Sequence, residues 1–127
     1  MVQRGDLLAT FAVNTIDGAA FDYDTVWQRR NLLLVSLPRD GLRGAANTYA
    51  RDLSQRREQI MAHEAVCVIT FDAVARVPCP AVVVADRWSE VYFVSAPATV
   101  EELPTPDEII EWLRFVDHEC PECQGGR

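Results

Sequence analysis

Residues 31–71 read NLLLVSLPRDGLRGAANTYARDLSQRREQIMAHEAVCVITF, and this stretch decides the fold. It begins with the apolar run NLLLVSL at 31–37 and ends with the apolar run AVCVITF at 65–71. Both runs have the length and composition of β-strands that are buried on both faces. Pro38 ends the first run, and the turn residues that follow it predict a loop.

Residues 42–61, between the two runs, have the pattern of an amphipathic helix. One face is apolar, and charged side chains, including Arg43, Arg51, Arg56, Arg57 and Glu58, point elsewhere. The apolar face consists of Leu42, Ala46, Tyr49, Leu53 and Ile60. A strand, a helix and a strand in this order predict a βαβ unit, in which the two strands are parallel and the crossover is right-handed.

The segments on either side of this unit carry signals of their own. Asp17-Gly18 predicts a hairpin within residues 7–21, and Asp24 begins a stretch typical of a short helix. After the unit, two strands are predicted at 81–85 and 90–94, joined by a tight turn.

The last predicted element is a helix with a clear beginning. The sequence TPDE from Thr105 to Glu108 is a capping box with proline at the first helical position. Pro121 ends the helix by about Glu119. Its apolar face consists of Ile109, Trp112, Leu113 and Val116.

The order of these elements resembles the thioredoxin fold, and more closely the redoxins related to alkyl hydroperoxide reductase and thiol-specific antioxidant proteins, a peroxiredoxin-like family. The segments that carry the resemblance are GDLLATFAVNTIDGAAF, RNLLLVSLPR, VPCPAVVVADRWSEVYFV and EIIEWLRFV, within residues 5–119. The resemblance implies an α/β protein with a thioredoxin-like fold, in which a central mixed β-sheet is flanked by helices. We expect one such domain over residues 1–119 and a flexible C-terminal tail with a CxxC pair at 120–127.

In the resembling family, the loop after the central strand holds the reactive cysteine, because a helix begins there and its amides stabilise a thiolate. A peroxiredoxin pattern would place that cysteine at Ala45, and a thioredoxin pair would fall within 39–44. The degenerate loop instead contains Pro38, Arg39, Asp40, Gly41, Arg43 and Ala45. We therefore expect no peroxidase or dithiol chemistry at this loop. It either binds an anion through free helix-start amides and Arg39 and Arg43, or is a solvated turn.

Cys79-Pro80 is a second candidate site. The resemblance implies that Pro80 is the cis-proline of the family and that Cys79 faces the loop without its cysteine. Cys79 is then a lone nucleophile beside the helix start, or a small, partly buried hydrophobic residue, which is the commoner role. Cys67 lies inside an apolar strand and is expected to be a core residue.

Cys120 and Cys123 form a Cys-Pro-Glu-Cys pair in the tail, with the spacing of a redox motif. The pair follows a helix, and Glu119 and Glu122 flank it, so both the helix dipole and the carboxylates disfavour a thiolate. The alternatives are an inert tail or a metal site that adds His118 as a ligand. A structural zinc site needs four ligands, so this site requires another group or a second chain.

Charge and composition exclude some classes of binding partner. The 127 residues suit one domain, and the net charge of −7 is concentrated after residue 100. An acidic protein of this kind is not expected to bind nucleic acid or an anionic membrane. The start of the chain has charged residues and no apolar run of the kind found in signal peptides, so we expect a cytoplasmic protein.

Two functions follow from these observations. The first is a redoxin-type thiol–disulfide oxidoreductase that uses Cys120 and Cys123, with Cys79 as a further thiol, and acts on a thiol or disulfide protein partner. The second is a thioredoxin-like scaffold that binds a partner or a small anion and catalyses nothing. Neither function calls for a cofactor, and the sequence leaves the oligomeric state open.

Overall fold

A four-stranded sheet in the order β4-β3-β5-β6 forms the centre of the structure, a computed structural model that describes residues 1–118. Strand β3 pairs in parallel with β4 on one side and antiparallel with β5 on the other, and β5 pairs antiparallel with β6. The strand bounds are β3 (Asn31–Ser36), β4 (Ala65–Thr70), β5 (Ala81–Ala85) and β6 (Val91–Ser95). The predicted mixed sheet and its parallel βαβ unit are therefore confirmed.

Strand β3 is apolar throughout because both of its faces are covered. All six of its residues are buried, and its side chains alternate between two apolar clusters. Leu33 and Val35 belong to the cluster on the helix side of the sheet, whereas Leu32 and Leu34 belong to the cluster on the opposite side. A strand buried on both faces has no polar face, so its sequence shows no alternation.

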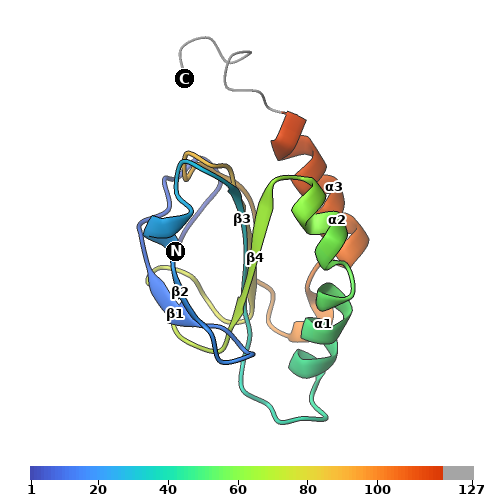
Figure 1. Cartoon of the computed structure of the whole chain (residues 1–127). Helices are drawn as coiled ribbons and strands as arrows, with labels where there is room; N and C mark the ends of the chain where they lie inside the picture. Colours follow the sequence, from blue (N-terminus) through green and yellow to red (C-terminus); the bar gives the residue numbers. More distant parts are fainter. Residues whose placement is uncertain (119–127) are drawn as a thin grey trace.

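Three α-helices cover one face of the sheet, as Figure 1 shows. They are α1 (Ala45–Ser54), α2 (Arg57–Ala62) and α3 (Pro106–His118), and a short 3-10 helix η2 (Val100–Glu102) precedes α3. Within residues 1–118, no helix has the length and apolar character that crossing a membrane requires.

The single helix predicted over residues 42–61 is wrong in two respects. Leu42 is 89% exposed, because α1 begins only after Gly44. Gly41, the residue before Leu42, has a left-handed φ of 92°, which glycine adopts readily. The helix is also interrupted at Gln55 and Arg56, so that α1 and α2 are separate. Leu53 and Ile60 nevertheless pack in the same core cluster, as their spacing predicts.

An N-terminal hairpin covers the other face of the sheet (Figure 1). Its strands β1 (Ala12–Asn14) and β2 (Ala20–Asp22) are antiparallel, and Gly18 in the turn has a φ of 89°. The expected short helix is the 3-10 helix η1 (Tyr23–Thr25). Its cap is Asp22 rather than Asp24, because the Asp22 carboxylate accepts a hydrogen bond from the Asp24 amide at 3.0 Å.

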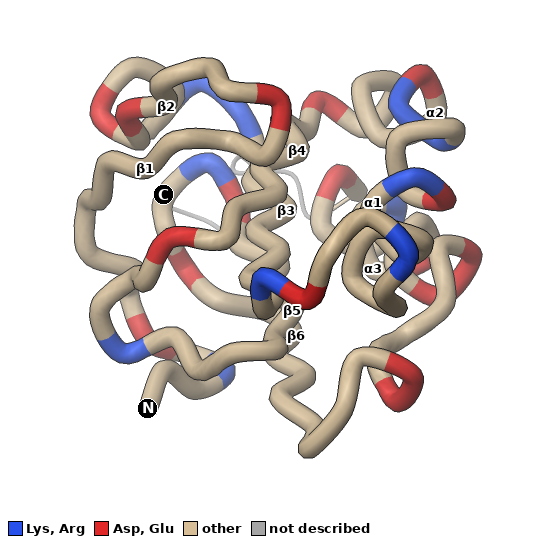
Figure 2. Tube along the Cα trace, turned by 90° about the horizontal axis from the view of Figure 1, so that it is seen from below, with Lys and Arg blue, Asp and Glu red and all other residues tan. Residues whose placement is uncertain are grey.

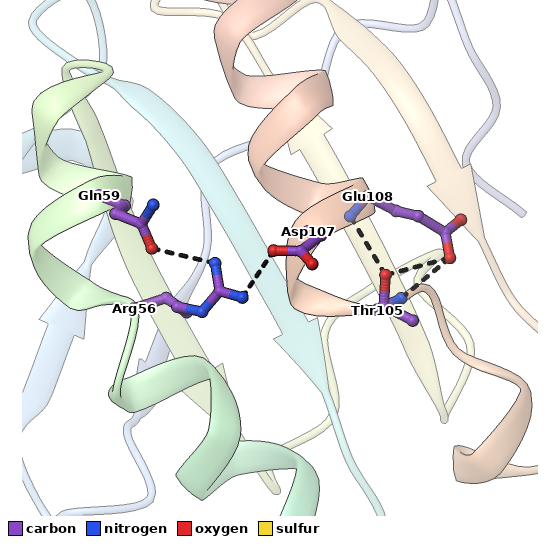
Figure 3. A network of polar contacts seen from close by, with 5 residues as sticks. All are labelled: Arg56, Gln59, Thr105, Asp107 and Glu108. Atoms are coloured by element: carbon purple, nitrogen blue, oxygen red, sulfur yellow. Dashed lines mark hydrogen bonds and ion pairs between the residues drawn. The ribbon is translucent and has the colours of Figure 1, made fainter.

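Polar contacts fix the beginning of α3 against the junction of α1 and α2 (Figure 3). The Thr105 hydroxyl accepts a hydrogen bond from the Glu108 amide at 3.2 Å, and the Glu108 carboxylate accepts one from the Thr105 amide at 3.3 Å. This is the predicted capping box. Next to it, Arg56 forms an ion pair with Asp107 at 2.6 Å, which links α3 to the helix interruption.

Replacing Thr105 tests how much this cap contributes to the fold. Thr105→Ala removes the hydroxyl and should lower the free energy of unfolding by about 1 kcal/mol. Thr105→Ser keeps the hydroxyl and is the matched control, which should be about as stable as the wild type because serine is at least as good an N-cap as threonine. Urea denaturation measures both variants, and equal stability of Thr105→Ala and the wild type would contradict the role of the cap.

Candidate functional site

Hydrogen bonds from side chains hold the loop between β3 and α1 in place. Gly44 is the N-cap residue of α1, but the capping group comes from Asp40, whose carboxylate accepts a hydrogen bond from the Ala46 amide at 3.1 Å. The side chain of Asn47 donates a hydrogen bond to the Gly41 carbonyl at 2.5 Å and closes the turn. The chain thus supplies its own anion to the start of α1, where negative charge is favourable.

Gly44 makes room for this carboxylate. A Cβ atom added at Gly44 would overlap the carboxyl group of Asp40, so a larger residue would displace the cap. The expectation that this helix start has free amides is therefore wrong for Ala46. At the start of α1, an aspartate carboxylate thus lies where the helix dipole favours negative charge.

The two arginines of the loop, Arg39 and Arg43, have different surroundings. The guanidinium of Arg39 lies over the ring of Phe71, 4.7 Å from its centroid, in a cation–π contact. Arg43 is exposed and takes part in none of the ion pairs found within residues 1–118. An anion-binding role for the loop is thus weakened by Asp40 and is not supported by these arginines.

Cys79-Pro80 lies at the same end of the sheet as this loop. Ala81, the next residue, pairs with Ser36 at the end of β3, which leads directly into Pro38. The Cys79-Pro80 bond is cis, as predicted. Cys79 is exposed, so the expectation that it is a partly buried hydrophobic residue is wrong. Pro80 is buried and anchors the segment that presents the thiol.

Cys67 has a different environment. It is half-buried on β4 and packs against the helix-side core cluster, as expected of a core residue. Burial raises the pKa of its thiol to about 11, and the nearby Arg57 only partly offsets this effect. A thiol with this pKa is almost entirely protonated at neutral pH and is a poor nucleophile.

The tail pair, Cys120 and Cys123, lies outside the described residues. His118 is exposed at the end of α3, and the neighbouring Asp117 carboxylate is 3.7 Å from Nδ1 of His63. Within residues 1–118, no three His, Cys, Asp or Glu side chains are grouped closely enough to hold a metal ion. A metal site that combines His118 with the tail pair therefore remains a hypothesis.

Acidic and basic residues are spread over the helices and over the hairpin side of the molecule (Figure 2).

A groove lined by two arginines and by apolar side chains was not predicted from the sequence. Arg30 and Arg57 line a groove at the outer edge of β4, together with Cys67. These arginines are far apart in the chain, so no sequence motif predicts the groove.

The capping role of Asp40 was also missed, although Asp followed by Gly at the end of a strand is a signal for a turn.

Known structures provide an independent view of the fold. The reduced 2-Cys peroxiredoxin of Plasmodium vivax superimposes with a TM-score of 0.72 at 9% identity, covering 93% of this chain and 83% of its own. A thioredoxin-family thiol:disulfide interchange protein from Chlorobium tepidum TLS gives 0.63 at 8% identity, covering 92% and 99%. A peroxiredoxin-like protein from Aquifex aeolicus gives 0.62 at 12% identity, covering 91% and 88%.

No protein-family model and no curated protein matches the sequence. At the low identities of the structural matches, the comparisons establish the fold alone. The thioredoxin-like fold expected from the order of the elements is confirmed, and the peroxiredoxin-like resemblance is confirmed at the level of architecture.

A cysteine installed at Ala45 tests the effect of the Asp40 carboxylate. In a background with Cys79, Cys120 and Cys123 changed to Ser, Ala45→Cys places a thiol on the first residue of α1. A neighbouring carboxylate raises a thiol pKa, so adding Asp40→Asn should lower the pKa of this thiol by about one unit. The pH dependence of its alkylation rate measures the shift.

The matched control for this experiment is Asp52→Asn, which removes the same charge from the exposed side of α1 without touching its start. It should leave the alkylation profile of the Ala45→Cys thiol nearly unchanged. Identical profiles for the Asp40→Asn and Asp52→Asn variants would show that the Asp40 carboxylate does not govern the charge at the helix start.

Proposed function

We propose that this thioredoxin-like chain is a redoxin-type thiol–disulfide oxidoreductase whose reactive thiols lie outside the loop at residues 38–45. Cys120 and Cys123 are the exchanging pair, and Cys79 is an additional accessible thiol. The observation that supports this most is the contrast between the two described thiols. Cys79 is exposed beside the loop, whereas burial raises the pKa of Cys67 to about 11.

The geometry of the loop also supports reactive thiols that lie outside residues 38–45. The Asp40 carboxylate accepts a hydrogen bond from the Ala46 amide. The positive end of the α1 dipole is therefore next to an aspartate and not next to a thiolate. Thiol chemistry in this chain then depends on the cysteines elsewhere. The partner is a protein that carries a thiol or a disulfide, and no resident cofactor is needed.

The proposed reaction is a two-electron exchange. A thiolate of the tail pair attacks one sulfur of the partner's disulfide, and the other sulfur leaves as a thiolate that takes up a proton. The second cysteine of the pair then displaces the partner and closes the Cys120–Cys123 disulfide. The chain loses two electrons and two protons, and the partner gains them as two thiols.

A second candidate function is a binding scaffold without catalysis. It is favoured by the same Asp40 cap, because the helix start is stabilised permanently by the chain's own carboxylate. Under this alternative, the tail pair is inert or binds a metal together with His118. The two functions differ in the rate at which the tail thiols react, and this difference can be measured.

Thiol counting under a mild disulfide oxidant tests the proposal. We expect a rapid and reversible loss of two thiols, which alkylation and mass spectrometry should assign to Cys120 and Cys123. Cys67 should remain unmodified, because a pKa of about 11 leaves roughly one part in a thousand as thiolate at pH 8. The rate for the tail pair should rise with pH, because thiolate is the attacking form.

The variant Cys120→Ser/Cys123→Ser should lose the fast phase, and Cys67→Ser is the matched control that should keep it. If the fast phase survives loss of the tail pair, the proposed assignment is wrong. If the tail thiols resist both oxidant and alkylating agent, the binding scaffold is the better account. Resistance that a chelator abolishes would instead assign them to a metal.

A further inference from the structure

A groove with a volume of about 390 Å³ lies beside β4. The turn of the hairpin, the helices α1 and α2, and β4 itself all contribute residues to its lining. Its volume is in the lower part of the range of small-molecule sites, which is roughly 300–1,000 Å³. Neither Cys79 nor any residue of the loop at 38–45 lines the groove, so it is separate from the site described above.

Apolar side chains make up much of the lining. They belong to Ile16, Ala19, Met61, Ala65, Val66 and Ile69. Met61 is 55% exposed, and Ile16 and Val66 are only half-buried, so part of this apolar surface is in contact with solvent. A ligand that covers such surface gains roughly 25 cal/mol for each Å² removed from water. These side chains supply the contacts, and the buried backbone of β4 is not needed for binding.

Two arginines add positive charge to the groove. Arg30 and Arg57 are exposed, and neither takes part in any ion pair found within residues 1–118. Among the described residues of the lining, Asp17 is the acidic one. Two arginines and one aspartate leave the lining positive, although the protein as a whole has a net charge of −7.

The charge of Arg57 acts on two walls of the groove. On the hairpin side, a hydrogen bond from the Thr15 hydroxyl lowers the pKa of Asp17, and Arg57 lowers it further. On β4, burial raises the pKa of the Cys67 thiol to about 11, and Arg57 partly offsets this rise. The guanidinium of Arg57 is therefore within electrostatic reach of both walls, and an anion between them would interact with the same charge.

We propose that this groove binds a small aliphatic carboxylate. The carboxylate pairs with Arg57, and the aliphatic chain lies on the apolar side chains of the lining. Arg30 adds a second positive charge. Guanidinium and carboxylate groups are planar and form two parallel hydrogen bonds, which makes arginine a suitable partner for this head group. An organic cation of the same shape lacks this pairing, and a carboxylate without a chain lacks the apolar contact.

Titration of the full-length chain with octanoate, followed through its amide NMR signals, tests the proposal. The signals of Ile16, Met61 and Val66 should shift and saturate, whereas those of residues 38–45 should not. Octylammonium has the same chain with the opposite charge, and acetate has the same head group without the chain. Each should bind at least about tenfold more weakly than octanoate, because every buried CH₂ contributes roughly fourfold to affinity and the ammonium is repelled by the arginines.

Substitutions at the charged residues of the lining sharpen this test. Arg57→Gln should weaken octanoate binding about fivefold, because it removes an ion pair at an exposed position. Asp17→Asn should strengthen binding about twofold, because it removes a carboxylate that repels the ligand. Arg43→Gln makes the same charge change at an exposed residue outside the groove and is the matched control, with unchanged affinity.

Cys67 provides a second readout, because it is half-buried in the lining of the groove. In the variant Cys79→Ser/Cys120→Ser/Cys123→Ser it is the one remaining thiol. Its alkylation is slow and can be followed at about pH 9.5, where more of the thiol is ionised. Saturating octanoate should slow this alkylation at least about fivefold by covering the groove, whereas octylammonium at the same concentration should leave the rate unchanged.

Equal octanoate affinity of the wild type and Arg57→Gln would overturn the proposal, and so would octylammonium binding as tight as that of octanoate. Shifts centred on residues 38–45 would also overturn it, because they would place the anion at the start of α1. Octanoate binding uses no cysteine chemistry, so Cys120→Ser/Cys123→Ser should lose the fast thiol phase and keep the affinity for octanoate. Loss of octanoate binding in this variant would contradict a site formed by the groove.

Discussion

The burial of β3 on both faces is the constraint on which the rest of the structure depends. The strand is hydrogen-bonded on both edges, and its side chains enter two separate apolar clusters. The helices must therefore cover one face and the hairpin the other, because uncovered leucines and valines would lose the free energy of burial. The same constraint places the end of β3, and hence the loop that follows it, beside Cys79 at one end of the sheet.

At that end of the sheet, the start of α1 is capped by a side chain of the loop itself. A helix start with amides and a favourable dipole attracts negative charge, and in this chain the charge comes from Asp40. Gly44 leaves the space that this carboxylate needs. The start of α1 is thus occupied by a carboxylate, a group that cannot transfer electrons. Any thiol chemistry of the chain then belongs to cysteines outside this loop.

Much of the architecture follows from local patterns in the sequence. The continuous apolar runs at 31–37 and 65–71, the Asp17-Gly18 turn and the capping box at Thr105 all predict elements that the structure contains. These signals are reliable because they arise from short-range geometry and from burial. The prediction of one helix over residues 42–61 was wrong at Leu42, because the helix begins after Gly44, where Asp40 caps it, and apolar periodicity does not reveal such a cap.

The site was harder to predict, because it depends on contacts between distant residues. The sequence shows that residues 38–45 contain no cysteine, but the hydrogen bond from the Ala46 amide to Asp40 depends on the folded turn. The exposure of Cys79 depends on how the segment before β5 folds, and the usual burial of free cysteines favoured the opposite result. The groove at β4 combines arginines from two distant segments, so it becomes visible only when the chain is folded.

The central claim is that the Asp40 carboxylate occupies the start of α1. Amide hydrogen exchange of Ala46 at neutral pH, compared between the wild type and Asp40→Ala, tests it most directly. The account predicts that the Ala46 amide exchanges several-fold faster in Asp40→Ala, because the carboxylate that accepts its hydrogen bond is lost. Equal exchange rates of the Ala46 amide in the two proteins would contradict the account.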